Sequence, residues 1–570
     1  MESSIRNCRT CRKDFVVESD DISFYDKVSV PFPTLCPHCR LIRRMLWRNE
    51  RAWYKRPCAA TGKLVLSMYH SDIPITVYDE SYWKTDAWDP FDYGREYDFS
   101  RGFFEQFREL WYEVPHPNLF QKSNVRSEYT NHTLDTKNCY LCASATKSED
   151  SAYLFTVIRH MRTCFDGHQS SRCEMCYETV DSHKCSRSAF IQDCETCSDS
   201  MLLYNCRNCT NCFGCVGLRS AQYCIFNVRY SKEDYKAVMD EIYEGGRASL
   251  EEAREKFEEL KLSVPRKYAA IVNAHNVSGD QIMNARNCRD CFLADDNVEE
   301  CAYCYRVWNN ARDGRDALIA WDGAELFCDV LSVTGQRIFF SAYIWGGSDM
   351  EYSYECFDCT NCFGCVGLRS KNYCIFNRPY EKEEYEVLVP RIRETMRARG
   401  EYGEFFPSEF SPFAYNETIA QDYFPLKKEE AIAAGYAWRD REPRTYSVTI
   451  AASDLPGRIQ DVSDSILKET IACAHGGTCE DQCATAFRIL PEELQFYRSM
   501  KLPLPQLCPN CRHYARVRMK TPLNLWHRDC MCEQGNHGHE GRCSVGFETA
   551  YAPGRPEIVY CEQCYQKEIV

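Results

Sequence analysis

The sequence predicts a mainly β protein with some α-helix, in which a duplicated cysteine-rich β-solenoid is flanked by zinc ribbons at both termini. Three observations predict it: 38 cysteines in 570 residues, paired cysteine motifs near both ends, and a 19-residue segment that recurs mid-chain. We see no export signal and no apolar run long enough to span a membrane. We therefore expect a cytoplasmic protein without membrane contact, with reduced thiols and metal sites instead of disulfides.

The first predicted ribbon pairs Cys8-x2-Cys11 with Cys36-x2-Cys39, with 24 residues between the two pairs. Two such knuckles present four thiolates, the ligand set of a closed tetrahedral zinc site. The metal would replace a hydrophobic core that so short a segment cannot build alone.

The second predicted ribbon repeats the first near the other end of the chain. A shift of 472 residues places Cys11 on Cys483 and continues without gaps through the next cysteine pair. The first knuckle has three residues between its cysteines instead of two, so Cys473 or His475 competes for a ligand position. The predicted ligands are Cys479, Cys483, Cys508 and Cys511.

A third zinc-binding module closes the chain around the knuckle Cys561-x2-Cys564. The cysteines and histidines upstream exceed what one tetrahedral zinc needs, and spacing leaves open which of them complete the site. We expect one ion here, with the spare groups structural, and about three zinc ions in the whole chain. The predicted ligands are Cys530, Cys532, Cys543, Cys561 and Cys564, with His537 and His539 nearby.

These cysteine patterns, with Phe15, Pro33 and Arg40 in the first ribbon, resemble the probable zinc-ribbon domains of many uncharacterised bacterial proteins. As a whole, the chain resembles uncharacterised bacterial multi-ribbon proteins. The resemblance covers roughly the first 45 and the last 100 residues. It implies zinc binding and no particular reaction.

The middle of the chain is an internal duplication. Residues 209–227 recur at 359–377, with 17 of 19 positions identical. A finer period of 21 residues aligns Cys164, Cys185 and Cys206. Like residues at a fixed period stack on each other in a β-solenoid, so we predict coils of about 21 residues.

The second copy indicates what these cysteines do. Cys173 becomes Gly323 and Cys194 becomes Ile344, which a metal ligand cannot do but a packed thiol can. Packing is the favoured interpretation, with zinc and an iron–sulfur cluster as alternatives for the runs that both copies keep. Those runs are Cys206, Cys209, Cys212 and Cys215, and Cys356, Cys359, Cys362 and Cys365.

Charged helical sequence follows each solenoid half and predicts caps over the solenoid ends, the first of them beginning at Ser231. The predicted units are the first ribbon with its basic segment at 1–57, an aromatic connector at 58–125, a solenoid half at 126–230, a helical cap at 231–275, the second solenoid half at 276–380, a cap and linker at 381–470, the second ribbon at 471–525 and the C-terminal module at 526–570.

Two basic segments beside the ribbons suggest a function. Clustered arginines with interleaved aromatic residues favour binding of nucleic acid or a nucleoprotein, whereas docking on the protein's own acidic helix at 251–259 is the equal alternative. No nucleotide-binding or catalytic motif appears, so we lean towards a non-enzymatic multi-zinc scaffold. The rival hypotheses are a protein–protein adaptor and an iron–sulfur redox protein. The candidate nucleic-acid contacts are Arg40, Arg43, Arg44, Arg48, Arg512, Arg516 and Arg518.

Overall fold

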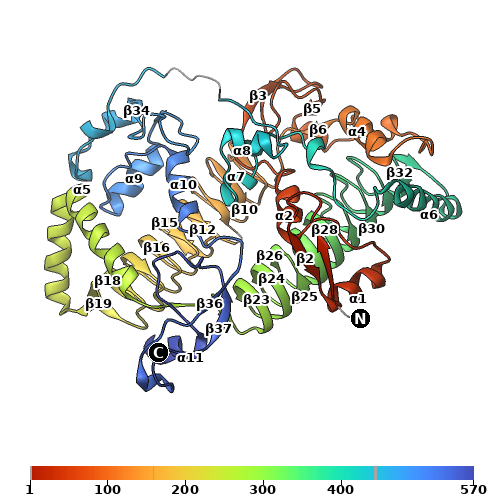
Figure 1. Cartoon of the computed structure of the whole chain (residues 1–570). Helices are drawn as coiled ribbons and strands as arrows, with labels where there is room; N and C mark the ends of the chain where they lie inside the picture. Colours follow the sequence, from red (N-terminus) through yellow and green to blue (C-terminus); the bar gives the residue numbers. More distant parts are fainter. Residues whose placement is uncertain (1–2, 158, 442–445, 570) are drawn as a thin grey trace.

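The computed structural model describes residues 3–157, 159–441 and 446–569. It is a mixed α and β protein, with about 26% helix and 30% strand. Two stacks of short, mostly parallel strands form its two limbs, and hairpins with helices pack against them (Figure 1). None of the described helices is long and apolar enough to cross a membrane.

The first stack is a ten-stranded sheet whose parallel strands follow one another in chain order. Tyr177 lies opposite Ala189, and Ala189 opposite Met201, so each step is 12 residues. Its strands are β8 (Thr130–Asn131), β10 (Cys142–Ala145), β11 (Phe155–Val157), β13 (Phe165–His168), β15 (Tyr177–Val180), β16 (Ala189–Gln192), β17 (Met201–Tyr204), β18 (Thr210–Val216), β19 (Gln222–Ile225) and the antiparallel β20 (Val228–Arg229).

The second stack is a twelve-stranded sheet of the same kind. Arg312 lies opposite Glu325, a step of 13 residues, and Thr360 lies opposite Asn372, a step of 12. Its strands are β22 (Ile271–Val272), β23 (His275–Met283), β24 (Ala285–Asp295), β25 (Val298–Ala302), β26 (Tyr305–Trp308), β27 (Arg312–Ala320), β28 (Glu325–Val333), β29 (Gln336–Phe339), β30 (Gly347–Glu351), β31 (Cys359–Phe363), β32 (Asn372–Ile375) and the antiparallel β33 (Arg378–Pro379).

The predicted coil of 21 residues is wrong, because the strands repeat mainly every 12 residues. Every third residue from Cys164 to Cys215 is buried. Asn205, Asn208 and Asn211, each directly before a buried cysteine, have φ values of 52° to 54°, a left-handed conformation that turns the chain at every third residue. Since 12 and 21 are both multiples of three, inward cysteines give apparent similarity at 21 although the ladder steps by 12.

The interior of both stacks is packed with thiols, and all 38 cysteines of the chain are free. The Cys206 thiol is fully buried and lies 3.5 Å from the carbonyl oxygen of Cys215. The Cys215 thiol repeats this contact with the carbonyl of Cys224 at 3.4 Å. The cysteine spacing of the stacks is thus the spacing of inward positions, and the thiols fill the core as small hydrophobic groups.

A helix covers the end of each stack, as the sequence predicted. Helix α5 (Lys232–Ser263) contacts β18 and β19, and helix α6 (Lys382–Arg399) contacts β32 (Figure 1). The predicted N-cap is confirmed, because the Ser231 hydroxyl accepts a hydrogen bond from the Asp234 N–H at 3.0 Å. Gly246, at φ 61°, interrupts α5 where an added Cβ would lie 2.5 Å from the Gly457 carbonyl oxygen.

Four hairpin–helix units surround the stacks. The first unit has β1 (Ser4–Asn7), β2 (Asp14–Val17), α1 (Ser19–Val28) and α2 (Pro37–Met45), and the second has β3 (Tyr54–Pro57), β4 (Leu64–Ser67), β5 (Val77–Tyr78) and α3 (Glu80–Trp83). The third unit has β34 (Ile471–Ala472), β35 (Ala486–Phe487), α9 (Pro491–Ser499) and α10 (Pro509–Arg518). The fourth has β36 (Trp526–Asp529), β37 (Gly546–Thr549), β38 (Val559–Tyr560) and α11 (Glu562–Ile569).

An aromatic core joins the first and second units to the second stack. Trp47 and Trp111 are both almost fully buried, with ring centroids 6.2 Å apart, and each ring lies 5.8 Å from that of Tyr354. The remaining helices and short strands are α4 (Phe103–Glu113), α7 (Ala420–Tyr423), α8 (Lys428–Ala433), β6 (His116–Pro117), β7 (Gln121–Lys122), β9 (Thr133–Leu134), β12 (Met161–Arg162), β14 (Cys173–Glu174) and β21 (Arg266–Lys267). Single 3-10 turns are η1 (Pro90–Tyr93), η2 (Ser408–Phe410), η3 (Tyr415–Glu417), η4 (Ala452–Asp454), η5 (Ile459–Asp461), η6 (Asp464–Lys468) and η7 (Gly535–His537).

Candidate metal centres

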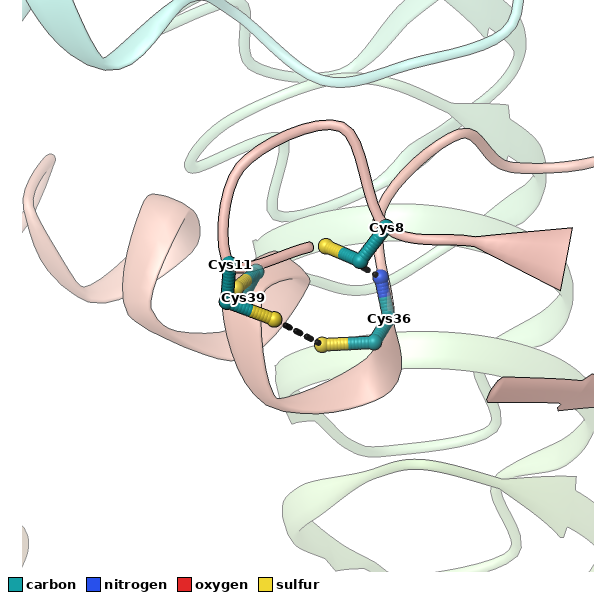
Figure 2. A group of neighbouring side chains, drawn as sticks. All are labelled: Cys8, Cys11, Cys36 and Cys39. Carbon is teal, nitrogen blue, oxygen red and sulfur yellow. Dashed lines mark hydrogen bonds between the residues drawn. The ribbon is translucent and has the colours of Figure 1, made fainter. Parts of the chain in front are cut away.

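The first unit brings its four predicted ligands together. The sulfur atoms of Cys8, Cys11, Cys36 and Cys39 all lie within 4.8 Å of one another (Figure 2). The Sγ atoms of Cys11 and Cys36 are 3.7 Å apart, and the Cys36 backbone N–H donates to Cys8 Sγ at 3.2 Å. Four thiolates at this separation could hold one tetrahedral metal ion.

Local backbone geometry places these thiols. Cys8 directly follows the last paired residue of β1, and its N–H donates to the carbonyl of Lys13 at 2.9 Å. Cys36 is the N-cap of α2, so the positive end of the helix faces its sulfur. A hydrogen bond from the Cys39 thiol outweighs burial and lowers the pKa of Cys36 to about 4, which favours the thiolate that a metal requires.

In the third unit the four-thiol group contains Cys473 in place of the predicted Cys479. The sulfur atoms of Cys473, Cys483, Cys508 and Cys511 lie within 4.8 Å of one another. Cys473 directly follows β34, and its N–H donates to the Thr485 carbonyl at 2.8 Å, which repeats the geometry of Cys8. The sequence comparison had no gap and therefore missed the loop inserted between the first two ligands.

Cys479 lies on that inserted loop, next to the four-thiol group. Its sulfur is 3.7 Å from Cys511 Sγ, and it forms a neighbouring group with His475, Asp481 and Cys511. The sequence had named Cys473 and His475 as competitors for this knuckle, and the structure places each of them in one of the two groups.

The fourth unit shows which upstream residues accompany the Cys561 and Cys564 knuckle. The sulfur atoms of Cys530, Cys543, Cys561 and Cys564 lie within 4.8 Å of one another. The Cys561 N–H donates to Cys530 Sγ at 3.2 Å, as Cys36 does to Cys8 in the first unit. The predicted Cys532 stands outside this group, with its sulfur 3.1 Å from His537 Nδ1.

The second unit has the same backbone but only one cysteine, and the sequence analysis missed it. Cys58 N–H donates to the Lys63 carbonyl at 2.8 Å, and the Asp79 N–H donates to Cys58 Sγ at 3.2 Å. Thr61 and Asp79 stand where the first unit has its second and third cysteines. The signal was present, because Cys58-x2-Thr61 precedes a Gly-Lys pair just as Cys8-x2-Cys11 precedes Arg-Lys.

The duplicated runs in the stacks do not form such groups. Within the described parts of the chain, none of their eight cysteines belongs to a set of ligand atoms that all lie within 4.8 Å. Their thiols instead lie near backbone carbonyls, for example Cys209 Sγ at 3.5 Å from the Leu218 oxygen and Cys359 Sγ at 3.3 Å from the Phe357 oxygen. This geometry agrees with the packing interpretation. The eight residues are Cys206, Cys209, Cys212, Cys215, Cys356, Cys359, Cys362 and Cys365.

The arginines of the first basic segment are buried and do not form an exposed nucleic-acid surface. Arg40 Nε donates to Asp316 Oδ1 at 2.8 Å, and Arg44 also contacts Asp316. Arg43 Nη2 donates to Asp329 Oδ2 at 2.6 Å. The side chains lie under the protein surface because these carboxylates, supplied by the second stack, pair with them. The relative exposures are 2% for Arg40, 6% for Arg43, 0% for Arg44 and 3% for Arg48, which pairs with Glu50.

The second basic segment repeats this burial. Arg512 Nε donates to Asp166 Oδ2 at 2.8 Å, and Arg516 Nη1 donates to Asp166 Oδ1 at 2.6 Å. Only Arg518 among the seven predicted contacts is open to solvent, at 58% side-chain exposure, and it pairs with Asp481. The alternative of internal docking is thus the one that the structure shows, on acids of the stacks and not on the helix at 251–259.

The two docking contacts are equivalent by sequence as well as by geometry. Asp166 and Asp316 are 150 residues apart, the offset of the duplicated stacks, and Arg40 and Arg512 are 472 apart, the offset of the two ribbons. Helix α2 lies on the second stack at β27 and β28, and α10 lies on the first stack at β13 (Figure 1). Each ribbon-like unit is thus held by the limb at the other end of the duplication.

A tyrosine–carboxylate contact follows the same rule. Tyr303 OH donates to Asp21 Oδ2 at 2.7 Å, and Tyr153 OH donates to Glu493 Oε2 at 3.1 Å. The tyrosines differ by 150 and the acids by 472. Burial works against ionisation of Asp21, but the Arg289 and Arg315 guanidinium groups outweigh it and lower the pKa of its carboxyl.

Comparison with protein-family models, curated proteins and solved structures gave no match. Conclusions about function therefore come from the geometry of the chain itself.

Proposed function

We propose that the protein is a non-enzymatic, multi-zinc scaffold. In this proposal the two stacks are the halves of a β-solenoid, and the first, third and fourth units are zinc ribbons. Zinc is the ion that four thiolates at tetrahedral separation suit best in a reduced compartment. The metal fixes each knuckle, and the knuckle fixes the helix that reaches the solenoid.

The observation that carries the proposal is the repeated docking of α2 on Asp316 and of α10 on Asp166. Cys36 and Cys508 begin these helices, four residues before Arg40 and Arg512. A metal that holds the cysteine therefore also orients the arginine. The zinc sites act as clamps on the limbs, which gives the chain a rigid shape without requiring a reaction.

The buried arginines enter this proposal as internal contacts. Arg44 and Arg516 cannot reach a phosphate unless their units leave the stacks, because their exposures are 0% and 2%. We therefore assign nucleic acid no contact through these side chains.

A protein-adaptor role is the second candidate, favoured by the outward face of the second stack. Side-chain amides form ladders there, with Asn273 Nδ2 donating to Asn284 Oδ1 at 2.7 Å and Asn276 Nδ2 to Asn287 Oδ1 at 2.9 Å. These contacts are exposed to solvent. A regular polar surface of this kind offers hydrogen-bonding groups to a protein partner.

Elemental analysis of anaerobically purified full-length chain tests the proposal. We expect at least three zinc ions per chain, one for each four-thiol group, and loss of one ion in Cys39→Ser. Cys209→Ser in the first stack is the matched control and should leave the zinc content unchanged. Iron with a visible absorption band that bleaches on reduction would instead support the iron–sulfur alternative and contradict the scaffold.

A further inference from the structure

A second group of ligand atoms lies beside the four thiols of the fourth unit. The ligand atoms of Cys532, His537, His539 and Cys564 all lie within 4.8 Å of one another. Cys532 Sγ is 3.1 Å from His537 Nδ1, and Cys564 Sγ is 3.4 Å from His539 Nε2. Cys564 belongs to both groups, so its sulfur stands between them.

The histidine rings are oriented as metal ligands are. His539 Nδ1 lies 2.8 Å from the Gly541 carbonyl oxygen, which takes the ring N–H and leaves the Nε2 lone pair facing Cys564. His537 has the Glu568 carboxylate 3.6 Å from Nε2, on the side away from Cys532. A carbonyl or carboxylate behind the ring is the usual second partner of a metal-bound histidine.

The number of ligands fits two ions that share one thiolate. The two groups of four have Cys564 in common and therefore contain seven side chains. Two tetrahedral ions need eight ligand positions, and one bridging thiolate counts for both. One ion alone would leave Cys532, His537 and His539 without a role, although Cys532 and His537 are buried.

The third unit repeats the arrangement independently. His475, Cys479, Asp481 and Cys511 form a second group that shares Cys511 with the four thiols. The Nδ1 atom of His475 is buried and has no hydrogen-bond partner in the described part of the chain. Cys511, like Cys564, is the last cysteine of its unit.

The extra ligands come from the same place in both units. They lie on the loop inserted between the first and second thiol, from Cys473 to Cys483 and from Cys530 to Cys543. The first unit has the short Cys8-x2-Cys11 turn instead, and none of the described residues forms a second group with its thiols. The insertion and the second group therefore occur together.

We propose that the third and fourth units each hold two zinc ions bridged by a thiolate, that of Cys511 in one and of Cys564 in the other. The inference rests on the proposed zinc binding of the four-thiol groups. The second ion pins the inserted loop to the helix that carries the bridging cysteine. Thiols lose their protons to solvent on binding, and the neutral histidine nitrogens donate lone pairs.

Native mass spectrometry of the full-length chain, with elemental analysis, counts the ions. We expect five zinc ions per chain, one for each ligand group. His537→Ala with His539→Ala should remove one ion and keep the Cys530 group filled. His475→Ala with Asp481→Asn should also remove one.

His527→Ala is the matched control, because His527 is an exposed histidine of the same unit, paired with Glu548, and belongs to neither group. Its zinc content should equal that of the wild type. Three ions in the wild type, unchanged in both double variants, would overturn this inference and leave the proposed function standing. Absence of zinc from the wild type would overturn the proposed function itself. Loss in only one double variant would overturn the inference for the other unit.

X-ray absorption at the zinc edge gives a readout that does not depend on how well the variants fold. Three four-thiolate sites would show only zinc–sulfur bonds of about 2.3 Å. Five sites with histidine ligands would add a zinc–nitrogen shell at about 2.0 Å in the wild type. Absence of that shell would contradict the two-ion centres.

Discussion

The first and third units make the same contacts on different limbs, yet their metal-binding loops differ. In both, an arginine four residues after a helix N-cap cysteine reaches a buried aspartate, Asp316 or Asp166. The first unit has a two-residue turn between its first two thiols, whereas the third has a nine-residue loop. The docking thus depends on the helix and not on the length of the knuckle, which leaves the loop free to acquire other ligands.

The second unit sharpens this comparison, because it keeps the hairpin with Cys58 alone. Its helix α3 buries Trp83, whose indole N–H donates to the Pro115 carbonyl at 2.8 Å. Where the aromatic core supplies packing, the backbone of the unit persists without a ligand set. The metal is needed where the unit has little core of its own.

The largest expected effect comes from removing the shared carboxylates. Asp166→Ala leaves the buried guanidinium of Arg516 without its ion-pair partner, and Asp316→Ala does the same to Arg40. Each should lower the free energy of unfolding by about 3–5 kcal/mol, the cost of breaking a buried ion pair from one side. Denaturant unfolding of the zinc-loaded chain measures it.

Equivalent docking requires the two losses to be similar. Asp349→Ala, which removes an exposed partner of Arg337 in the second stack, is the control and should change stability by less than about 1 kcal/mol. A large loss for one aspartate and none for the other would show that the two contacts are not equivalent.

A smaller effect is expected from the tyrosine contacts. Tyr303→Phe and Tyr153→Phe each remove a hydrogen bond to a buried carboxylate, Asp21 or Glu493. Each should cost about 1–3 kcal/mol, because the acceptor is charged and stays buried. Thermal unfolding compares them, and the account fails here if neither variant differs from the wild type.

The thiols of the stacks should matter less. Cys206→Ala deletes one buried atom from a column whose members donate only to backbone carbonyls. We expect a loss of about 1 kcal/mol, similar to other small deletions in a core, and no change in metal content. Loss of metal in this variant would move the stacks from packing to metal binding.

The smallest effect is expected at Arg518, the exposed member of the predicted nucleic-acid contacts. Arg518→Glu should change stability by less than about 1 kcal/mol, as exposed ion pairs usually do. Titration with single- and double-stranded RNA and DNA at two salt concentrations should give the same weak binding for the variant and the wild type. A clear loss of salt-dependent affinity would restore the nucleic-acid hypothesis at this position.

The sequence was most informative where ligands are close in the chain. The group of Cys8, Cys11, Cys36 and Cys39 follows from spacing alone, as does the helix that begins at Ser231. Cys473 was missed because a loop separates it from the next ligand, and the 12-residue step was hidden by the three-residue period of inward positions.

Burial of the arginines was not visible locally, because Arg40 and Asp316 are 276 residues apart. A run of arginines beside a knuckle has the same composition on a surface and in a docked helix. The signal lay in the two offsets taken together, since the arginines repeat at 472 and the aspartates at 150. Only the contact in space connects the two repeats.

Hydrogen–deuterium exchange of the full-length chain, with its metal bound and after removal by a chelator under reducing conditions, tests the clamp most directly. We predict that metal removal increases exchange in β1–β2 and β34–β35 and in the docked helices α2 and α10. Exchange in β3–β4 of the second unit, with its single Cys58, should stay unchanged. Equal increases in all of these hairpins, or none in α2 and α10, would contradict the account that metal ions hold the helices on the stacks.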